Sequence, residues 1–411
     1  MYSSRTSRPL KQHQRGAVLM IMLVIMVMGV VAFFVGSLSS SALRVKQDEV
    51  AANSLVQAKE ALIGAAASEA QVTLAGYLEL PDLGPNISIE GNAAGNFSGN
   101  SKDFSVIGKM PWKTLRISPL RDGQNECLWY VVSGRFKNIP PTDALNWDTL
   151  GQIDVIDGNG NVIANNVAAL LVAPGRPLDA QSRVLSDPAY IQCGGNYDAQ
   201  NYLDSYNVSD AVIGEINYFA GSTNNRVALN ANNKRFVMTN NNHYNDQFLL
   251  VTTDDIFRPI IRRNDFSAQI TALLNDATFI AHLQLIPIAG GKGTNNVICN
   301  NTSNADNKTF CDNWKEMLLL AQLPLLPPTN ITITNNGVST VIGPCNRVVI
   351  FGGQKIAPQV RLTAANKDDP ANYLEGANLT AFTTSPPPAS NFSGALTFHA
   401  NSPSTDLLRC I

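Results

Sequence analysis

The sequence predicts an α+β protein, with one long N-terminal helix followed by an antiparallel-sheet head in two tandem α+β lobes. Three observations predict this class: an uncharged apolar run at residues 17–35, short strand-like runs between clusters of Gly, Pro and Asn, and a weak internal repeat. The expected organisation is a basic leader at residues 1–16, a helix at residues 17–70, and lobes at residues 71–252 and 253–411.

The composition excludes one class of partner. The 411 residues carry a formal net charge of −2, and only 15% of them are charged. No basic field is present to hold nucleic acid, so no nucleic-acid partner is expected. The abundance of Asn, Gly, Ser and Thr suits an uncharged extracytoplasmic surface.

The N-terminal segment predicts a transmembrane helix. Residues 17–35 contain no charge, and this length is at the lower end of what spans a bilayer as a helix. The charged residues that precede the run are all basic. This charge pattern places the N-terminus in the cytoplasm and anchors the chain in the inner membrane. Apolar residues then recur at helical spacing to about residue 67. A secretory signal peptide is the alternative, but its apolar core is shorter, about 7 to 15 residues.

The stretch "QRGAVLMIML" at residues 14–23 resembles the N-terminus of the type IV pilin and pseudopilin family. In that family a basic leader ends in Gly, a prepilin peptidase cleaves after it, and the new, methylated N-terminus begins a helix that packs in a filament core. The resemblance implies cleavage between Gly16 and Ala17. It also implies two kinds of partner: the prepilin peptidase, and other pilin or pseudopilin subunits bound through the helix.

One position departs from the family pattern. Most pilins have a Glu five residues after the cleavage site, whereas this chain has Ile21. A lone charge in a membrane segment costs about 2.5 to 3.5 kcal/mol, so that Glu needs a partner on a neighbouring subunit. The K subunit of type II secretion pseudopili and PilX-like minor pilins also lack it. Ile21 therefore favours a minor subunit near the filament tip; an unprocessed single-pass anchor is the alternative.

All six cysteines follow the apolar segment, which predicts disulfides and an oxidising compartment. Free thiols in a cytosolic protein are the alternative. The short polar loop between Cys299 and Cys311 makes their pairing the favoured one. The other preferred pairs are Cys345 with Cys410 and Cys127 with Cys193.

Turn signals predict two β-hairpins. The segment "DGNGN" separates two alternating apolar runs, and Asn336-Gly337 separates "NITITN" from "VSTVI". In the first turn, Asp157, Asn159 and Asn161 place an oxygen at every second residue, which is a weak signal of a calcium site. The bidentate Glu of an EF-hand loop is missing, so a plain hairpin turn is favoured.

Two regions of the chain resemble each other. "VAALLVAPGRPLDAQSR" followed by "NYLDSYN" parallels "RVVIFGGQKIAPQVR" followed by "NYLEGAN". Each copy has an apolar run, a Gly turn and a Gln-x-Arg step ending at Arg183 or Arg361. Two copies predict a duplicated lobe rather than a solenoid, which needs at least about three repeats. The elements "MPW", "APG" and "DDIF" also resemble those of a broad set of proteobacterial prepilin-type proteins.

Between the copies, two helices are expected. The first begins at Thr253 or Asp254, has Pro259 in or near its first turn, and carries an apolar stripe that continues to Ile280. The second covers residues 312–323.

No constellation of residues indicates an enzyme or a cofactor. The sequence lacks a nucleophile elbow, a zincin motif and a Walker loop, and "GGKGT" at residues 290–294 lacks the preceding glycine and strand of such a loop. His282 is interpreted as packed or at the surface rather than as a base. Asp254 and Asp255 are interpreted as a helix cap rather than an acid pair.

The sequence therefore predicts a minor pilin or pseudopilin that assembles into a type IV pilus or a type II secretion filament. Its head is expected in the periplasm before assembly and in the filament, at the cell surface or in the periplasm, afterwards. The alternative is a surface adhesin or ligand-binding protein displayed on a pilin-type anchor. Its candidate contact residues are Tyr197, Tyr202, Tyr206 and Tyr244.

Overall fold

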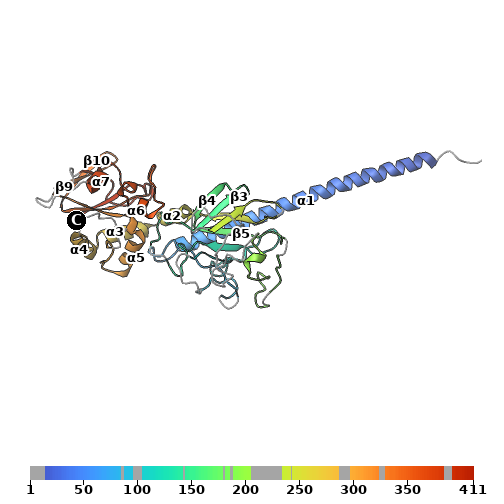
Figure 1. Ribbon diagram of the computed structural model, residues 1–411, viewed down its shortest axis with the longest axis horizontal. Helices are drawn as coiled ribbons and strands as arrows, with labels where there is room; N and C mark the ends of the chain where they lie inside the picture. The colour runs from blue at the N-terminus through green and yellow to red at the C-terminus, as the bar shows by residue number, and fades with distance from the viewer. Residues whose placement is uncertain are drawn as a thin grey trace, which may run out of the picture.

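A computed structural model gives the architecture of the protein (Figure 1). It describes residues 14–84, 88–95, 104–141, 144–178, 181–185, 188–204, 234–241, 243–286, 297–323, 329–383 and 391–411. A long helix, α1, projects from one end of an elongated head, and the C-terminus lies at the other end (Figure 1).

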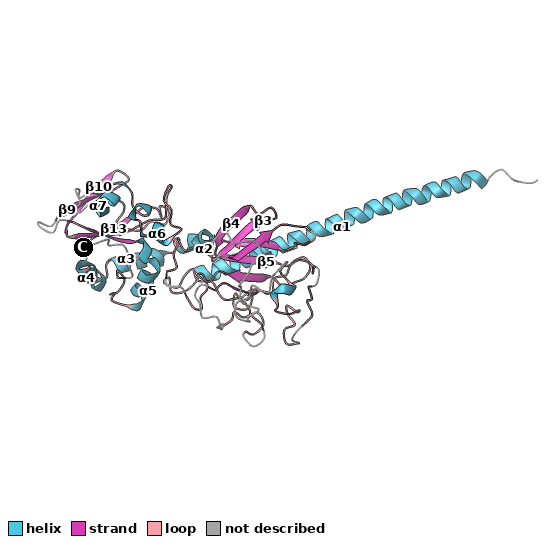
Figure 2. Ribbon diagram, in the orientation of Figure 1, coloured by secondary structure: helices cyan, strands magenta, loops and turns pink. Residues whose placement is uncertain are grey.

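Helix α1 (Gln14–Ala67) differs along its length (Figure 2). Towards its C-terminal end, one face is buried in the head, because small and apolar residues recur there at spacings of three and four. That face consists of Ala51, Leu55, Ala58, Leu62 and Ala66. Lys59 adds a polar anchor, since its Nζ donates to the Asp255 carboxylate at 2.8 Å. Towards the other end, every side chain from residue 19 to residue 31 is exposed.

The predicted transmembrane segment at residues 17–35 requires a correction. Within the described part of the chain, no helix combines enough length with enough apolar character to traverse a bilayer. In that part of α1, the side chains that are described run from residue 19 to residue 31.

The strands between residues 106 and 251, which we call the first head unit, form two sheets. One sheet is antiparallel throughout, in the order β1-β2-β5-β7, and packs on α1; the other has the order β4-β3-β6. The bounds are β1 (Val106–Lys109), β2 (Trp129–Val132), β3 (Ile153–Asp157), β4 (Val162–Val167), β5 (Ala169–Ala173), β6 (Lys234–Met238) and β7 (Gln247–Val251), with the 3₁₀ helix η1 (Ala199–Asn201).

The strands between residues 318 and 410 form the second head unit, again with two sheets. Their orders are β13-β11-β8 and β10-β9-β12. The strand bounds are β8 (Leu318–Gln322), β9 (Thr329–Asn335), β10 (Val338–Cys345), β11 (Arg347–Phe351), β12 (Asn391–Ser393) and β13 (Leu407–Cys410). The helices are α2 (Thr253–Ile260), α3 (Asn264–Leu274), α4 (Ala277–Leu285), α5 (Ala305–Trp314), α6 (Ala364–Asp368) and α7 (Gly376–Thr383), with η4 (Lys315–Met317) and η5 (Pro370–Asn372).

The two head units share one topology. In each, a central strand (β5 or β11) lies between an earlier and a later antiparallel strand, β2 and β7 or β8 and β13. A hairpin, β3–β4 or β9–β10, connects the earlier strand to the central one. The first strand of each hairpin pairs in parallel with a later strand: β3 with β6, and β9 with β12. The expected antiparallel-sheet head therefore requires a correction, because each unit contains one mixed sheet.

Both predicted hairpins are confirmed. Strand β3 pairs antiparallel with β4 on either side of "DGNGN", and β9 pairs antiparallel with β10 around Asn336-Gly337. Asn336 and Gly337 have φ values of 48° and 81°, which a two-residue type I′ turn requires and which Asn and Gly tolerate best.

The helices between the units differ from prediction. The N-cap is Thr252, whose side chain forms a capping box with Asp255, and the single predicted stripe is divided into α2, α3 and α4. Pro259 lies in the second turn of α2, just before the helix ends. The second predicted helix, at residues 312–323, is also wrong beyond its start, since residues 318–322 form the buried strand β8. A short apolar run fits a buried strand and a helix equally well by periodicity.

One hydrophobic core connects α1, the α2–α5 helices and both head units. At its centre, Trp147 from the first half of the chain meets Trp314 of α5, with ring centroids 4.7 Å apart and an edge-to-face geometry. Phe266 of α3 packs between Trp314 and Phe398, at centroid distances of 5.1 and 5.3 Å. The two units are therefore packed together through aromatic side chains.

The prediction of disulfide bonds is confirmed. The bonds join Cys127 with Cys193, Cys299 with Cys311, and Cys345 with Cys410. Cys299–Cys311 ties the loop before α5 to that helix. Cys345–Cys410 ties the end of β10 to the last strand.

The disulfides should differ in the stability they supply. They close sequence separations of 12 residues for Cys299–Cys311 and 65 for Cys345–Cys410. Loop-closure entropy predicts that C299S/C311S lowers the free energy of unfolding by about 3 kcal/mol and C345S/C410S by about 4 kcal/mol. Urea unfolding of the two double variants measures the difference. A larger loss for C299S/C311S would contradict the entropic account.

Candidate functional site

The described N-terminal part of α1 is a continuous apolar surface. Its large side chains between residues 19 and 31 have exposed fractions from 50% at Val30 to 74% at Leu19. Exposed apolar surface of this extent marks an interaction site in soluble proteins. Each such side chain, when fully buried by a partner, would stabilise the association by about 1.5–3 kcal/mol. This surface is one candidate functional site.

The processing residues predicted from the sequence lie at the start of this surface. Gly16 and Ala17 belong to the first turn of α1, although their side-chain environment is outside the described residues. Ile21 is 59% exposed and continuous with its apolar neighbours. A Glu at this position would also be solvent-accessible in the isolated chain. Replacing that Glu with Ile therefore changes the energy of the helix only when α1 has packing partners.

The repeated Gln-x-Arg step folds into a clasp. In the first head unit, Arg183 donates to the carbonyl oxygens of Gly175 (Nη1, 2.7 Å) and Asn201 (Nε, 2.9 Å), and to Gln181 Oε1 (Nη2, 3.1 Å). Gln181 Oε1 also accepts from the Leu178 backbone N–H at 3.0 Å. The guanidinium thereby fastens the loop after β5 to η1.

The second head unit repeats these bonds. Arg361 donates to the carbonyl oxygens of Gly353 (Nη1, 3.0 Å) and Asn372 (Nε, 2.6 Å), and to Gln359 Oε1 (Nη2, 3.1 Å). Gln359 Oε1 accepts from the Ile356 N–H at 3.1 Å. Each guanidinium also lies over a tyrosine ring: Arg183 is 4.8 Å from Tyr202, and Arg361 is 4.1 Å from Tyr373. The repeat seen in the sequence is thus a structural device.

The clasps differ in their carboxylate partners. Arg361 Nη1 lies 2.7 Å from Asp148 Oδ2, with side-chain exposures of 1% and 4%. Arg183 Nη1 lies 3.4 Å from Glu126 Oε1, which is 23% exposed. Burial raises the pKa of Asp148, and the guanidinium of Arg361 offsets part of that rise. Because Asp148 precedes β3, this ion pair connects the two head units.

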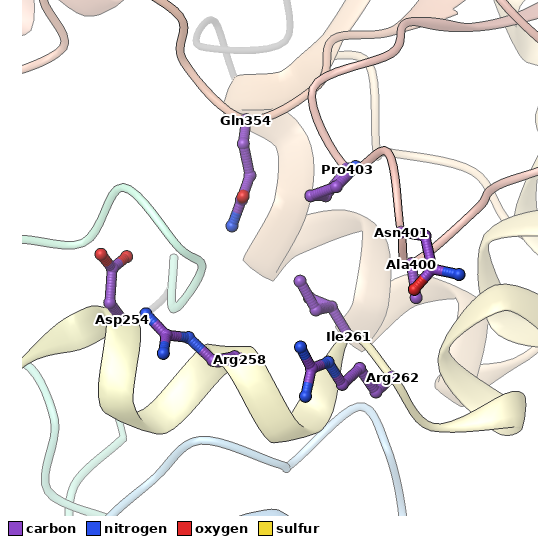
Figure 3. A pocket seen from close by; sticks show the side chains of 8 residues that line it. All are labelled: Asp254, Arg258, Ile261, Arg262, Gln354, Ala400, Asn401 and Pro403. Atoms are coloured by element: carbon purple, nitrogen blue, oxygen red, sulfur yellow. The ribbon is translucent and has the colours of Figure 1, made fainter.

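Each head unit also contains a polar cleft beside the turn that its clasp holds. The second-unit cleft has a volume of about 320 Å³ and lies between α2 and two loops, one after β11 and one before β13 (Figure 3). The first-unit cleft, of about 360 Å³, lies between α1 and the corresponding loops, after β5 and before β7. The lining of the second-unit cleft is Asp254, Arg258, Ile261, Arg262, Gln354, Ala400, Asn401 and Pro403.

Polar groups of the second-unit cleft are available for a ligand. Arg258 and Arg262 are exposed and lie on the α2 side of the cleft, with the Arg258 guanidinium directed toward Asp254, while Gln354 points toward α2 from the opposite side (Figure 3). Among the described residues, the side chains of Arg258, Arg262, Gln354 and Asn401 form no hydrogen bond or ion pair. Sequence reasoning missed these residues, although two arginines four apart on a predicted helix were a visible signal.

The calcium candidate at the first hairpin is occupied by internal bonds. Asp157 Oδ1 accepts from the backbone N–H groups of Asn159 and Asn161, both at 2.8 Å, and Oδ2 accepts from Asn161 Nδ2 at 2.7 Å. These bonds lower the pKa of the Asp157 carboxyl. The carboxylate therefore stabilises the turn.

Other sequence candidates take structural positions. Tyr197 and Tyr202 are buried, with exposures of 6% and 1%, so their proposed role as exposed ligand contacts is wrong. Tyr244 is half-buried, and Tyr206 and the "GGKGT" segment lie outside the described residues. His282 Nε2 is 2.7 Å from the Val297 carbonyl oxygen, at the surface of α4.

Comparison with protein families, with curated proteins and with solved structures finds no match for this chain.

The clasps should differ in their contribution to stability. Arg361→Met leaves the Asp148 carboxylate buried without its cation, which costs about 3–5 kcal/mol of folding free energy. The matched change, Arg183→Met, should cost less because water reaches Glu126. The double variant D148L/R361M should be more stable than R361M alone. Urea unfolding followed by tryptophan fluorescence compares the three. Equal losses for R361M and R183M would refute the unequal burial argument.

Asp406 predicts a pH dependence. Its carboxylate accepts from the Gly353 N–H at 3.1 Å and from Asn378 Nδ2 at 2.8 Å, and burial raises its pKa to about 7. Between about pH 4 and pH 7 the folded state holds a proton that the unfolded state releases. The protonated Asp406 carboxyl therefore contributes its full share of the free energy of unfolding below about pH 4, and this contribution is lost as the pH rises through about 7.

Denaturant unfolding at pH 4.5, 6 and 7.5 tests this dependence. Asp406→Asn should flatten the decline of the free energy of unfolding across this range, whatever its effect at one pH. The control is D368N, at an exposed aspartate of α6. The same slope for wild type and D406N would show that Asp406 is ionised in the folded protein at pH 6.

Proposed function

We propose that this chain is a minor subunit of a type IV pilus or a type II secretion filament, held in the filament by its N-terminal helix. The observation that carries the proposal is the contrast along α1. One part is built into the head, and the other presents uncharged apolar side chains that no described residue covers. Burial against the corresponding helices of neighbouring subunits would remove this surface from water.

Two features support a minor rather than a repeating subunit. Ile21 provides no carboxylate to pair with the N-terminal amine of a neighbouring subunit. The chain therefore needs no charged group of a neighbour beside this position in a helix bundle. The two head units, packed on each other through one core, also form a large head at one end of α1 (Figure 1). A subunit that ends the filament has room for such a head.

The disulfides support an extracytoplasmic head. Each head unit contains one disulfide that involves its own strands or loops, and a third ties down α5. Disulfides persist in oxidising compartments such as the periplasm and the cell surface.

The alternative, a displayed binding protein, has one specific observation in its favour. The second-unit cleft opens on the head, far along the chain from the apolar part of α1, and its polar side chains are unpaired among the described residues. A filament subunit and a binding head are compatible, because α1 and the cleft occupy different parts of the molecule.

Processing tests the proposed function. Co-expression with a prepilin peptidase should remove residues 1–16, and intact-mass measurement should find Ala17 at the N-terminus. Gly16→Leu should block the removal, because a bulky side chain replaces the residue that precedes the cut. Gly29→Leu is the matched control, since a Cβ atom added at Gly29 meets no atom within 4 Å. Wild-type protein that keeps its first sixteen residues beside an active peptidase would refute the proposal.

A further inference from the structure

We infer that the second-unit cleft binds carboxylate side chains of an acidic polypeptide segment. The inference begins with Arg258 and Arg262, which are one helical turn apart on the α2 side of the cleft (Figure 3). A guanidinium matches a carboxylate in a bidentate geometry, and such charge-assisted hydrogen bonds are about twice as strong as neutral ones. Two guanidinium groups that no described residue pairs therefore favour an anionic ligand at this cleft.

The rest of the lining suits a peptide. Gln354 and Asn401 carry side-chain amides, each of which can donate to a backbone carbonyl and accept from a backbone N–H. The apolar lining comes from Ile261, Ala400 and Pro403, which can hold the methylene groups of a glutamate stem. A volume of about 320 Å³ is at the small end of ligand pockets, so one or two side chains fill it.

The same lining disfavours two other anions. Asp254 stands on the α2 side of the cleft and reduces its local charge to +1, which suits a monoanionic carboxylate better than a phosphate dianion. The lining includes no aromatic residue, so an acidic sugar would find no ring to stack on. A carboxylate on a polypeptide fits the charge and the amides together.

The duplication supplies an independent argument. The first-unit cleft also has two arginines, Arg44 and Arg176, and several amides, but its two aspartates, Asp48 and Asp122, cancel their charge. There, Asp48 Oδ1 accepts from Gln247 Nε2 at 2.7 Å, and Asn245 Nδ2 donates to the Arg176 backbone carbonyl oxygen at 2.9 Å. The two clefts therefore differ in charge, and the second carries the net positive charge that a carboxylate ligand requires.

Fluorescence anisotropy with fluorescein-labelled hexaglutamate tests the inference on the full chain in detergent. Hexaglutamate should bind, and hexaglutamine should bind at least about tenfold more weakly. R258Q/R262Q should weaken hexaglutamate binding at least about tenfold, because two charged donors are lost. The charge-matched control R116Q/R409Q removes two exposed arginines outside the cleft and should leave binding unchanged. Unchanged circular dichroism shows that the variants fold.

Three results would overturn the inference. Hexaglutamate that binds no tighter than hexaglutamine would remove the role of the carboxylate. Equal weakening by R258Q/R262Q and R116Q/R409Q would show that net charge alone attracts the peptide. Displacement of hexaglutamate by trigalacturonate or inorganic phosphate at lower concentration than by unlabelled hexaglutamate would assign the cleft to a sugar acid or a phosphate. None of these outcomes depends on filament assembly.

Discussion

The structure depends on one helix that meets two different environments. Over its C-terminal part, α1 buries alanine and leucine side chains at helical spacing against the first head unit. Lys59 of the same part donates a hydrogen bond to the Asp255 carboxylate of α2. Over its described N-terminal part, the same helix exposes Leu, Met, Ile and Val to solvent. The head therefore buries one part of the helix, whereas no described residue covers the apolar part, and this asymmetry is the physical basis of the proposed assembly role.

The head repeats a single design twice. In each unit a guanidinium donates to the carbonyl of the turn glycine, to a 3₁₀-helix carbonyl and to a glutamine side-chain oxygen. The same guanidinium lies over a tyrosine ring. This clasp fixes the loop that walls the adjacent cleft. Packing between the units relies on the aromatic residues around Trp314 and on the buried Arg361–Asp148 pair, so the second unit is an integral part of the head.

The sequence predicted local features well and longer-range ones poorly. Asn336-Gly337 and "DGNGN" specify their turns through the backbone conformation and hydrogen bonds of the turn residues themselves. Both hairpins could therefore be predicted from the sequence. Residues 318–322 were misassigned because a five-residue apolar run carries no period that separates strand from helix. The buried Tyr197 and Tyr202 were missed because packing under Lys109 and Arg183 is invisible in sequence. The cleft joins residues about 150 apart, which only tertiary structure reveals.

Site-specific photocrosslinking tests the assembly role of α1 most directly. A benzophenone amino acid replaces Ile25, which is 65% exposed, or Val338 on β10, which is 69% exposed, in cells that produce the filament. The account predicts that the probe at position 25 forms an adduct with the N-terminal helix of a pilin-type subunit, and that the probe at position 338 does not. Filament-producing cells in which position 25 yields no such adduct would contradict it.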